Sequence, residues 1–454
     1  MTQYEPFVPN DPVAARRYGG PRLAALALLL GWANAFVASG ETAITTQDFL
    51  AGADMSHLAF FEARGIVYKS GGQTQDALAI LQQRGVNCVR LRLFTSSAAQ
   101  AQANPYNQIN NLDYTLPLAV RVKQAGLKFM LDFHYSDIWA DPAHQTKPGA
   151  WTNLTFPQLV LQMRTYNSNC IAAFRTAGAL PDYVQVGNEI TPGLLWPDGR
   201  NTDATHWSQL GQLMKAAIQG IRDAAGTNLP KTIVHLDRGG DWATTQWFFD
   251  NLNQQAVPFD IIGQSYYPFW HGTLADLRNC LTNATQRYGK PVLVAETGFP
   301  FAYSADVQGF PATTNGQVDF TIALAQVVKS VPGAMGIGIF WWGAEYQPLP
   351  GSGINLGGFD SKSLFGNQGD VLPVADVLGQ LAAPLVMRLS RSGDNLRLDW
   401  PLSGAGMSLL SATNLTPAAI WWPLSEPVQS TGTGFNLTLP LDACNNRFFR
   451  LQSK

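Results

Sequence analysis

The stretch Tyr183–Trp196, YVQVGNEITPGLLW, shows how an expected strand ends in this sequence. A short apolar run up to Val186 ends in Gly-Asn-Glu, and a Thr-Pro-Gly turn follows at once. Short apolar runs that are bounded by turn residues are typical of buried strands. An ionisable side chain, Glu189, therefore stands where a buried strand is expected to end.

The same kind of run recurs along the chain, which has 454 residues, 46% of them hydrophobic. Between the runs lie amphipathic stretches such as TQDALAILQQRG and TLPLAVRVKQAG, and several of them end in Gly, as helix C-caps do. The expected strands are Leu50–Ser56, Gly85–Leu93, Leu127–Tyr135, Tyr183–Asn188, Lys231–Asp237, Phe259–Tyr267, Lys290–Glu296 and Gly336–Trp342.

This succession of strand–helix units predicts an α/β fold, a (β/α)8 TIM barrel that spans residues 42–383. The chain is too long for one typical domain unless that domain is a large α/β barrel. A doubly wound open sheet is the alternative, because the same strands fit either fold. No Gly-rich phosphate-binding fingerprint follows the first strand, which disfavours the open sheet.

Residues 384–454 have a different pattern. Short alternating runs, such as NLRLDWP and GFNLTLP, are separated by Gly, Ser, Asn and Pro. This pattern predicts a small C-terminal all-β module without helices. Carbohydrate binding, spacing and surface attachment all remain open as its role, beside a purely structural one.

Residues 1–38 have the pattern of a secretory signal peptide. Arg16 and Arg17 precede an apolar run, Leu23–Val37, and Ala-Asn-Ala at 33–35 fits an Ala-x-Ala cleavage site. An uncleaved anchor is disfavoured, because the run is shorter than the ~20 residues that a spanning helix needs. A twin-arginine signal would rest on the arginine pair alone. We therefore expect a secreted protein, extracellular or periplasmic.

Charge and cysteine content exclude several classes of protein. The net charge of -2 provides no bulk field that would attract nucleic acids or anionic membranes. We expect a monomer with no nucleic-acid partner and no membrane contact once the signal is removed. The four cysteines are too far apart in sequence for a zinc knuckle or a disulfide scaffold. Cys88 lies in a strand-like run and is expected to be a buried free thiol.

Catalytic groups of a TIM barrel lie at the carboxyl ends of its strands. Applied to the expected strands, this rule selects a small set of polar and aromatic side chains. They are Asp54, His57, Arg90, Arg92, Asp132, His134, Asp137, Trp139, Asn188, Glu189, Tyr266, Tyr267, Glu296, Trp341 and Trp342, together with the segment HLDRGGDW (residues 235–242) at the end of the fifth strand.

Two glutamates in this set, Glu189 and Glu296, end the fourth and the seventh strand. A pair of carboxyl groups is the arrangement that glycoside cleavage needs, with one as proton donor and the other as nucleophile. A separation of ~5–5.5 Å would give retention of anomeric configuration. A lone glutamate at a strand end is more often an ion-pair partner, but two on these strands favour catalysis.

Neighbouring residues can support such a pair. Arg90 and Arg92 share one face of their strand, and either would keep Glu296 ionised if it lay beside it. Asn188 can offer its amide to a sugar 2-hydroxyl, and a tyrosine can hold the nucleophile through its phenol. Packing in the core or at the barrel rim is the alternative role for each of these helpers.

Other chemistries find little support in the sequence. Asp132, His134 and Asp137 come from one strand end and cannot all face inward, and there is no H-E-x-x-H pattern, so we expect no catalytic metal. There is no G-x-S-x-G elbow and no P-loop, so esterase and phosphoryl-transfer functions have no residues to support them.

Several motifs occur in an order that resembles one family. GADMS, GVNCVRLRLF, LDFHYSDIWADPAHQTKPGAW, VQVGNEITPGLLWPDG and VLVAETGFP are similar to segments of the endo-β-1,4-galactanases (arabinogalactan endo-1,4-β-galactosidases) of glycoside hydrolase family 53. The resemblance extends from about Phe49 to Leu378 and covers nearly the whole expected barrel.

The resemblance implies a TIM barrel that hydrolyses the β-1,4-galactan side chains of pectin, or type I arabinogalactan, and requires no cofactor. It implies Glu189 as acid/base and Glu296 as nucleophile. Bacterial members bind a structural calcium ion, for which Asp306, Asn315 and Asp360 are candidate oxygen donors here. The expected substrate-binding residues are Asp54, Arg90, His134, Trp139, Asn188, Trp196, Tyr266, Tyr267 and Trp341, and Trp270 is expected to help line an open groove.

Strand eight departs from the family pattern. The family usually has a Trp-Glu-Pro element there, whereas this chain reads FWWGAEYQP, so Trp341 aligns but Gly343 and Ala344 change the rim. The change therefore falls on the rim that would form the sugar subsites. Two alternatives stay open: another retaining endo-glycosidase that acts on mannan, xylan or glucan, and a non-catalytic carbohydrate-binding barrel.

Overall fold

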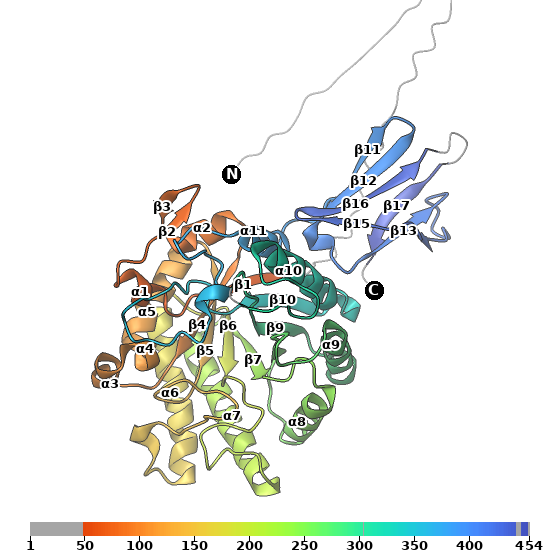
Figure 1. Cartoon of the computed structure of the whole chain (residues 1–454). Helices are drawn as coiled ribbons and strands as arrows, with labels where there is room; N and C mark the ends of the chain where they lie inside the picture. The colour runs from red at the N-terminus through yellow and green to blue at the C-terminus, as the bar shows by residue number, and fades with distance from the viewer. Residues whose placement is uncertain (1–48, 303, 442–445, 453–454) are drawn as a thin grey trace, which may run out of the picture. The chain divides into compact units, whose positions relative to one another are not determined.

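The computed structural model describes residues 49–302, 304–441 and 446–452 (Figure 1). The predicted signal peptide, residues 1–38, lies outside the described residues, and so does Cys444. None of the helices that the structure describes is long and apolar enough to cross a membrane.

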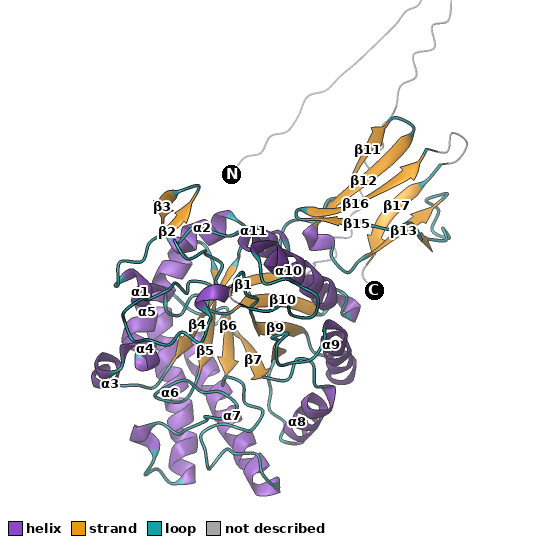
Figure 2. Ribbon diagram, in the orientation of Figure 1, coloured by secondary structure: helices purple, strands orange, loops and turns teal. Residues whose placement is uncertain are grey.

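Eight parallel strands close into a barrel in the order β1-β10-β9-β8-β7-β6-β5-β4 (Figure 2). Closure confirms the predicted TIM barrel and rules out the open sheet, because β1 pairs with both β4 and β10. The strands are β1 (Leu50–Asp54), β4 (Cys88–Leu93), β5 (Lys128–Phe133), β6 (Tyr183–Val186), β7 (Lys231–Leu236), β8 (Ile261–Ser265), β9 (Val292–Thr297) and β10 (Gly336–Trp341).

Helices lie between the barrel strands and cover the outside of the barrel (Figure 2). They are α1 (Leu58–Glu62), α2 (Ala77–Gln83), α3 (Ala98–Ala103), α4 (Pro105–Gln108), α5 (Leu112–Gln124), α6 (Phe156–Thr176), α7 (Ala204–Ala225), α8 (Trp242–Gln254), α9 (Leu274–Tyr288), α10 (Thr314–Lys329) and α11 (Pro373–Gln380). A short hairpin, β2 (Tyr68–Ser70) and β3 (Gln73–Gln75), precedes α2. Side-chain caps define several of the helix starts, as at Asp76 and Asp203.

The barrel interior changes from apolar to polar along the strands. Cys88, Met130 and Ile233 belong to an inner apolar cluster. Two residues further along each strand, the side chains are Arg90, Asp132 and His235, and all three are buried. Because side chains alternate across a strand, the same inward face that closes the bottom of the barrel supplies charged groups near its carboxyl end.

β9 breaks this alternation at a functional position. Leu293 and Ala295 contact the inner apolar cluster, so strict alternation would turn Glu296 outward. The pairing with β8 shifts register between Gln264 and Ser265, and Ser265 pairs with Glu296. A shift of this kind re-aims the side chains that follow it. Glu296 consequently faces the same interior as its neighbours.

The C-terminal residues form two antiparallel sheets, as the alternating pattern predicts. One sheet has the order β11-β12-β16-β15 and the other β14-β13-β17. Their strands are β11 (Arg388–Ser392), β12 (Asn395–Pro401), β13 (Ser408–Ala412), β14 (Trp422–Pro423), β15 (Gln429–Thr431), β16 (Gly434–Pro440) and β17 (Phe448–Gln452). The boundary at residue 384 stays a prediction.

The cysteines that the structure describes are buried thiols. Cys88, Cys170 and Cys280 are free, and the first is fully enclosed in the barrel. Burial raises the pKa of the Cys280 thiol to about 12, so the sulfur stays protonated and unreactive. The expectation of a buried free thiol at Cys88 is confirmed.

Candidate active site

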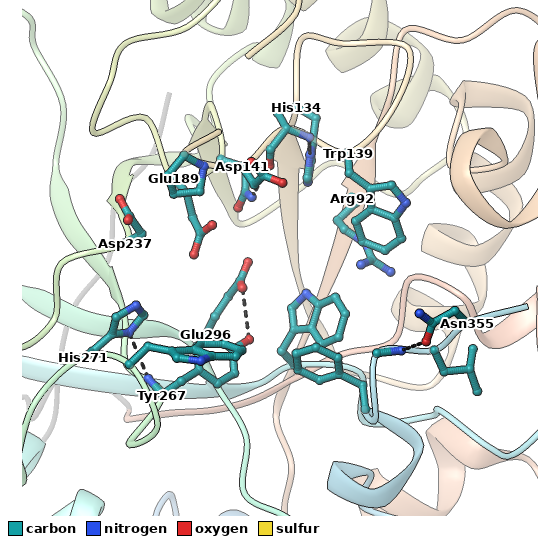
Figure 3. A pocket seen from close by; sticks show the side chains of 18 of the residues that line it. Arg92, His134, Trp139, Asp141, Glu189, Asp237, Tyr267, His271, Glu296 and Asn355 are labelled. Carbon is teal, nitrogen blue, oxygen red and sulfur yellow. Dashed lines mark hydrogen bonds between the residues drawn. The ribbon is translucent and has the colours of Figure 1, made fainter. Parts of the chain in front are cut away.

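A pocket of about 540 Å³ opens at the carboxyl ends of the barrel strands (Figure 3). Its polar residues come from successive strand ends, as the barrel rule predicts, and its loops add aromatic side chains. The lining residues are Arg92, Tyr106, His134, Trp139, Ala140, Asp141, Pro142, Asn188, Glu189, Asp237, Tyr267, Trp270, His271, Glu296, Trp342, Asn355, Leu356, Gly357 and Phe359.

Glu189 is presented to this pocket by a turn directly after β6. Gly187 has a φ of 95°, and a Cβ there would come within 2.6 Å of the Ile190 side chain, so only glycine fits. Glu189 itself has a φ of 49°, a left-handed conformation that costs a non-glycine residue roughly 1–2 kcal/mol. Such strained positions cluster at active sites, where the surrounding structure holds them.

The environment of Glu189 favours its protonated form. Its Oε1 accepts a hydrogen bond of 2.6 Å from the Ser265 hydroxyl. Burial, and then the negative charges of Glu296 and Asp237, raise the pKa of Glu189 well above its ordinary value. A carboxyl group in this state can donate a proton near neutral pH.

Glu296 projects from the opposite side of the pocket, and the two carboxyl groups face one another (Figure 3). Its Oε1 lies 2.8 Å from Arg90 Nη2, and its Oε2 accepts a hydrogen bond of 3.2 Å from the Tyr267 hydroxyl. Burial raises the pKa of Glu296 to about 7, with Arg90 acting in the opposite direction. Since no cation among the residues that the structure describes lowers the pKa of Glu189 in this way, Glu296 is the glutamate that loses its proton first.

Arg90 is the centre of a buried charge network beneath the pocket. Its Nη1 lies 2.8 Å from Asp54, its Nη2 lies 2.8 Å from Asp132, and its Nη2 also donates to Asn188 Oδ1 at 2.9 Å. Burial would lower the pKa of Arg90, but the carboxylates of Asp132, Glu296 and Asp54 more than reverse this effect. Removing one member of such a network costs about 3–5 kcal/mol, because its partners are left buried and unpaired.

Arg92 lies in the pocket wall and packs against two indole rings. Its guanidinium carbon is 4.2 Å from the ring centroid of Trp139 and 5.3 Å from that of Trp342. His57 Nδ1 accepts a hydrogen bond of 2.8 Å from Arg92 Nη2. The two ring centroids are 6.0 Å apart, so one cation packs against a pair of neighbouring rings and helps to hold both in place.

The structure brings many of the predicted residues together. Glu189, Glu296, His134, Trp139, Asn188, Tyr267 and Trp270 line the pocket, and Asp54 and Arg90 lie directly beneath it. The amide of Asn188 is already engaged, since its Oδ1 accepts from Arg90 and its Nδ2 donates to Ala140 O at 2.8 Å. One amide hydrogen is left for a ligand.

Besides Asp54 and Arg90, three more predicted substrate-binding residues lie outside the pocket lining. Trp341 is fully buried, and its indole N–H donates to Lys362 O, because strand alternation turns it away from the side that Trp342 occupies. The Tyr266 hydroxyl donates to Gly272 O. Trp196 is half-buried, and its N–H donates to Pro192 O.

Other residues of the site received no role in the sequence analysis. Gln185, His235 and Ser265 are fully buried on β6, β7 and β8, and they connect Arg90 with Glu189 through hydrogen bonds. The available signal was a polar side chain inside an otherwise apolar run, as in YVQVGN, KTIVHLD and IIGQSYY. Glu345 also received no role. It is fully buried, and its Oε1 accepts from the backbone N–H of His57 at 2.6 Å.

No group of three or more His, Cys, Asp and Glu side chains among the described residues could hold a metal ion. Of the candidate calcium donors, Asp306 follows β9, Asn315 lies in the first turn of α10, and Asp360 follows β10. A calcium ion near these residues stays a prediction.

The family model described as glycosyl hydrolase family 53 matches residues 50–378. The arabinogalactan endo-beta-1,4-galactanase of Humicola insolens is 38% identical over 305 residues, which cover 64% of this chain and 88% of that protein. The protein of the same name from Thermothelomyces thermophilus is 34% identical over 73% of this chain and 98% of its own length.

Solved structures give the same match. The family 53 catalytic domain from Ignisphaera aggregans aligns with a TM-score of 0.67 at 36% identity and covers 73% of this chain and 95% of that domain. A structure from a study of two fungal beta-1,4-galactanases aligns with a TM-score of 0.64 at 34% identity, over 72% of this chain and 98% of that chain. The family match ends before β11 begins at Arg388.

Proposed function

This chain belongs to glycosyl hydrolase family 53, and from that premise we propose that it is an endo-β-1,4-galactanase that cleaves the galactan of pectin side chains and type I arabinogalactan. The observation that carries the proposal is the pair Glu189 and Glu296 in one pocket, where Glu296 contacts Arg90 and Glu189 contacts no arginine of the described part of the chain. The relatives named as arabinogalactan endo-beta-1,4-galactanases support the choice of substrate.

We infer a retaining reaction in two steps. In the first step, a Glu296 carboxylate oxygen bonds to the anomeric carbon, the glycosidic C–O bond breaks, and Glu189 gives its proton to the departing oxygen. In the second step, Glu189 takes a proton from water, the water oxygen bonds to the anomeric carbon, and Glu296 is released. The higher proton affinity of Glu189 suits it to the acid role in the first step.

Neighbouring side chains prepare Glu296 for attack. Arg90 and the Tyr267 hydroxyl each hold one of its carboxylate oxygens, so the carboxylate has a defined orientation before substrate arrives. Asn188 would direct its remaining amide hydrogen to the sugar 2-hydroxyl, where hydrogen bonds strengthen in the transition state.

The pocket wall suits a chain of neutral sugars. Trp139 and Trp342 are neighbouring rings that Arg92 packs against, and Trp270 is 64% exposed at the edge of the pocket. Indole rings stack on the apolar faces of pyranose rings. We therefore propose a sugar-binding role for Trp342 in place of Trp341. We add Arg92 to the sugar-binding residues because it packs against the Trp342 ring.

Three further expectations accompany the proposal. The predicted signal peptide leads us to propose secretion, which N-terminal sequencing of the protein from culture medium would test. We propose that the enzyme acts as a monomer and needs no cofactor. Activity that survives extensive dialysis against a chelator would support the absence of a required metal.

Hydrolysis of linear debranched β-1,4-galactan, with the anomeric configuration of the first products followed by NMR, tests the main proposal. We expect oligosaccharides from internal cleavage, released first as the β-anomer. Release of the α-anomer would exclude retention. Hydrolysis of β-1,4-mannan, xylan or glucan with no cleavage of galactan would overturn the substrate assignment. Binding of galactan with no cleavage would indicate a carbohydrate-binding barrel.

A further inference from the structure

We propose that a chain of buried hydrogen bonds from Arg90 through Gln185, His235 and Ser265 fixes the acidic proton of Glu189 on one carboxyl oxygen, Oε2. The inference rests on the proposed function, in which Glu189 is the proton donor. It assigns positioning roles to three residues that lie behind the pocket wall and are absent from its lining.

The chain starts at a group that can only donate. Arg90 Nε lies 2.6 Å from Gln185 Oε1, and a guanidinium N–H has no acceptor capacity. The Gln185 amide must therefore present its oxygen to Arg90 and its NH₂ group in the other direction. That NH₂ group lies 2.9 Å from His235 Nδ1. An unpaired N–H in such a fully buried position would cost about 1–3 kcal/mol.

His235 is neutral, because burial and the charge of Arg90 lower its pKa well below the ordinary value. A neutral imidazole carries one N–H, so one ring nitrogen donates and the other accepts. If Nδ1 accepts from Gln185, the N–H is on Nε2, and it points at the Ser265 hydroxyl oxygen 2.9 Å away. In this tautomer each link of the hydrogen-bond chain pairs one donor hydrogen with one acceptor.

The opposite tautomer is less favourable. It would place a hydrogen on Nδ1 and direct it at Asn188 Oδ1, 3.0 Å away. That oxygen already accepts from Arg90, whereas the Gln185 NH₂ group would then face another N–H. Because buried donors are almost always paired in folded proteins, we assign the Nε2–H tautomer.

The tautomer determines the direction of the last hydrogen bond. Ser265 has a single hydroxyl hydrogen, and its oxygen accepts from His235, so the hydrogen is directed at Glu189 Oε1, 2.6 Å away. Oε1 is therefore an acceptor, and the carboxyl proton of Glu189 must be on Oε2. Among the described residues none donates to Oε2, which leaves this oxygen to the substrate.

One guanidinium thus orients both catalytic carboxyl groups. Arg90 holds Glu296 Oε1 directly and sets the proton position of Glu189 through the chain. In the first step the proton passes from Oε2 to the departing oxygen, and the Ser265 hydrogen stays on Ser265. The resulting carboxylate keeps its Oε1 hydrogen bond, so Oε2 can take the proton from water in the second step.

The direct test is the tautomer of His235 in the intact protein. The protein has six histidines, and the ¹⁵N resonances of His235 can be identified by comparison with a His235→Gln variant. We expect a neutral ring with the hydrogen on Nε2 across neutral pH. A ring with the hydrogen on Nδ1, or a charged ring, would overturn the proposal, whether or not the protein cleaves galactan.

A kinetic test uses Ser265→Ala, with Thr321→Val as a matched control. Thr321 is also fully buried, and its hydroxyl donates to Gln317 O within α10, so the control deletes a buried hydroxyl elsewhere. We expect kcat/KM on galactan to fall about tenfold or more in Ser265→Ala, because proton donation contributes ~10²–10⁴-fold to such reactions. The control should match the wild type.

Leaving groups separate proton positioning from general damage to the site. A dinitrophenyl β-galactobioside has a leaving group that departs without protonation, so its kcat/KM should change less than about twofold in Ser265→Ala. Equal losses on both substrates would refute the positioning role. A wild-type protein that is inactive on both would instead count against the proposed function, and the tautomer measurement would still decide the inference.

Discussion

Replacing Tyr267 with phenylalanine should move the acid limb of the pH–activity profile. The substitution keeps the buried ring and deletes the hydroxyl that donates to Glu296 Oε2 at 3.2 Å. In the proposed mechanism Glu296 attacks as a carboxylate, and a donor to the carboxylate favours the charged form. Its loss therefore raises the pKa of Glu296 above about 7, where burial, opposed by Arg90, has placed it.

The size of the shift follows from the hydrogen bond. A hydrogen bond to a charged group contributes about 1.5–3 kcal/mol, and the length of 3.2 Å places this one near the lower end. One pKa unit corresponds to about 1.4 kcal/mol, so the acid limb should move up by about one unit. Activity should fall below neutral pH and approach that of the wild type at the alkaline end of the plateau.

The assay is kcat/KM on soluble galactan across the pH range, because this ratio reports ionisations of the free enzyme. Tyr135→Phe is the matched control, since it removes a buried phenol hydroxyl that bonds to Asn167 outside the pocket. A downward shift of the limb, or a uniform loss of activity with no shift, would refute the assignment of the acid limb to Glu296.

Three other changes test separate parts of the site. Glu296→Ala should lower galactan hydrolysis by at least ~10³-fold, and added azide should restore turnover with an α-galactosyl azide as product; β-azide would contradict the nucleophile role. Burial raises the pKa of Glu345 from 4.5 to about 8. The free energy of unfolding of the protein should therefore fall as the pH rises from about 4.5 through 8, by up to about 4 kcal/mol. In Glu345→Gln, urea unfolding at pH 5 and 9 should show a smaller difference than in the wild type, and an equal difference would argue against this assignment. Arg92→Met removes the cation that packs against Trp139 and Trp342, so it should raise KM for galactan about tenfold and leave kcat nearly unchanged. An Arg450→Met control, which breaks the Arg450–Trp421 stack in the C-terminal module, should not change KM.

The parts of the site that sequence reasoning identified are those that depend on local pattern. Glu189, Asn188 and His134 follow apolar runs directly, so their place at strand ends could be predicted from the runs alone. Arg90 and Arg92 were expected on one face, and both lie in the charge network or the pocket wall. These inferences need only the two-residue period of a strand and the barrel rule.

The errors of detail arise where pairing between strands changes that period. Trp341 and Trp342 are adjacent in sequence, and nothing in FWWGAEYQP indicates which one faces the pocket. Register shifts along the β9–β10 pair decide it, and they give the pocket to Trp342. Gln185, His235 and Ser265 received no role in the sequence analysis, because a single polar residue in an apolar run is compatible with many roles.

Three features could be predicted from the sequence alone because each is a local pattern. Strands and helices alternate, a β-rich segment follows them, and two glutamates end the fourth and seventh strands. The roles proposed for the two glutamates rest instead on contacts between segments that are distant in sequence. The register shift that turns Glu296 inward, the arginine from another strand that contacts it, and the serine from a third strand that contacts Glu189 are all non-local. The roles of acid and nucleophile depend on these neighbours, because proton affinity is a property of the environment rather than of the residue type.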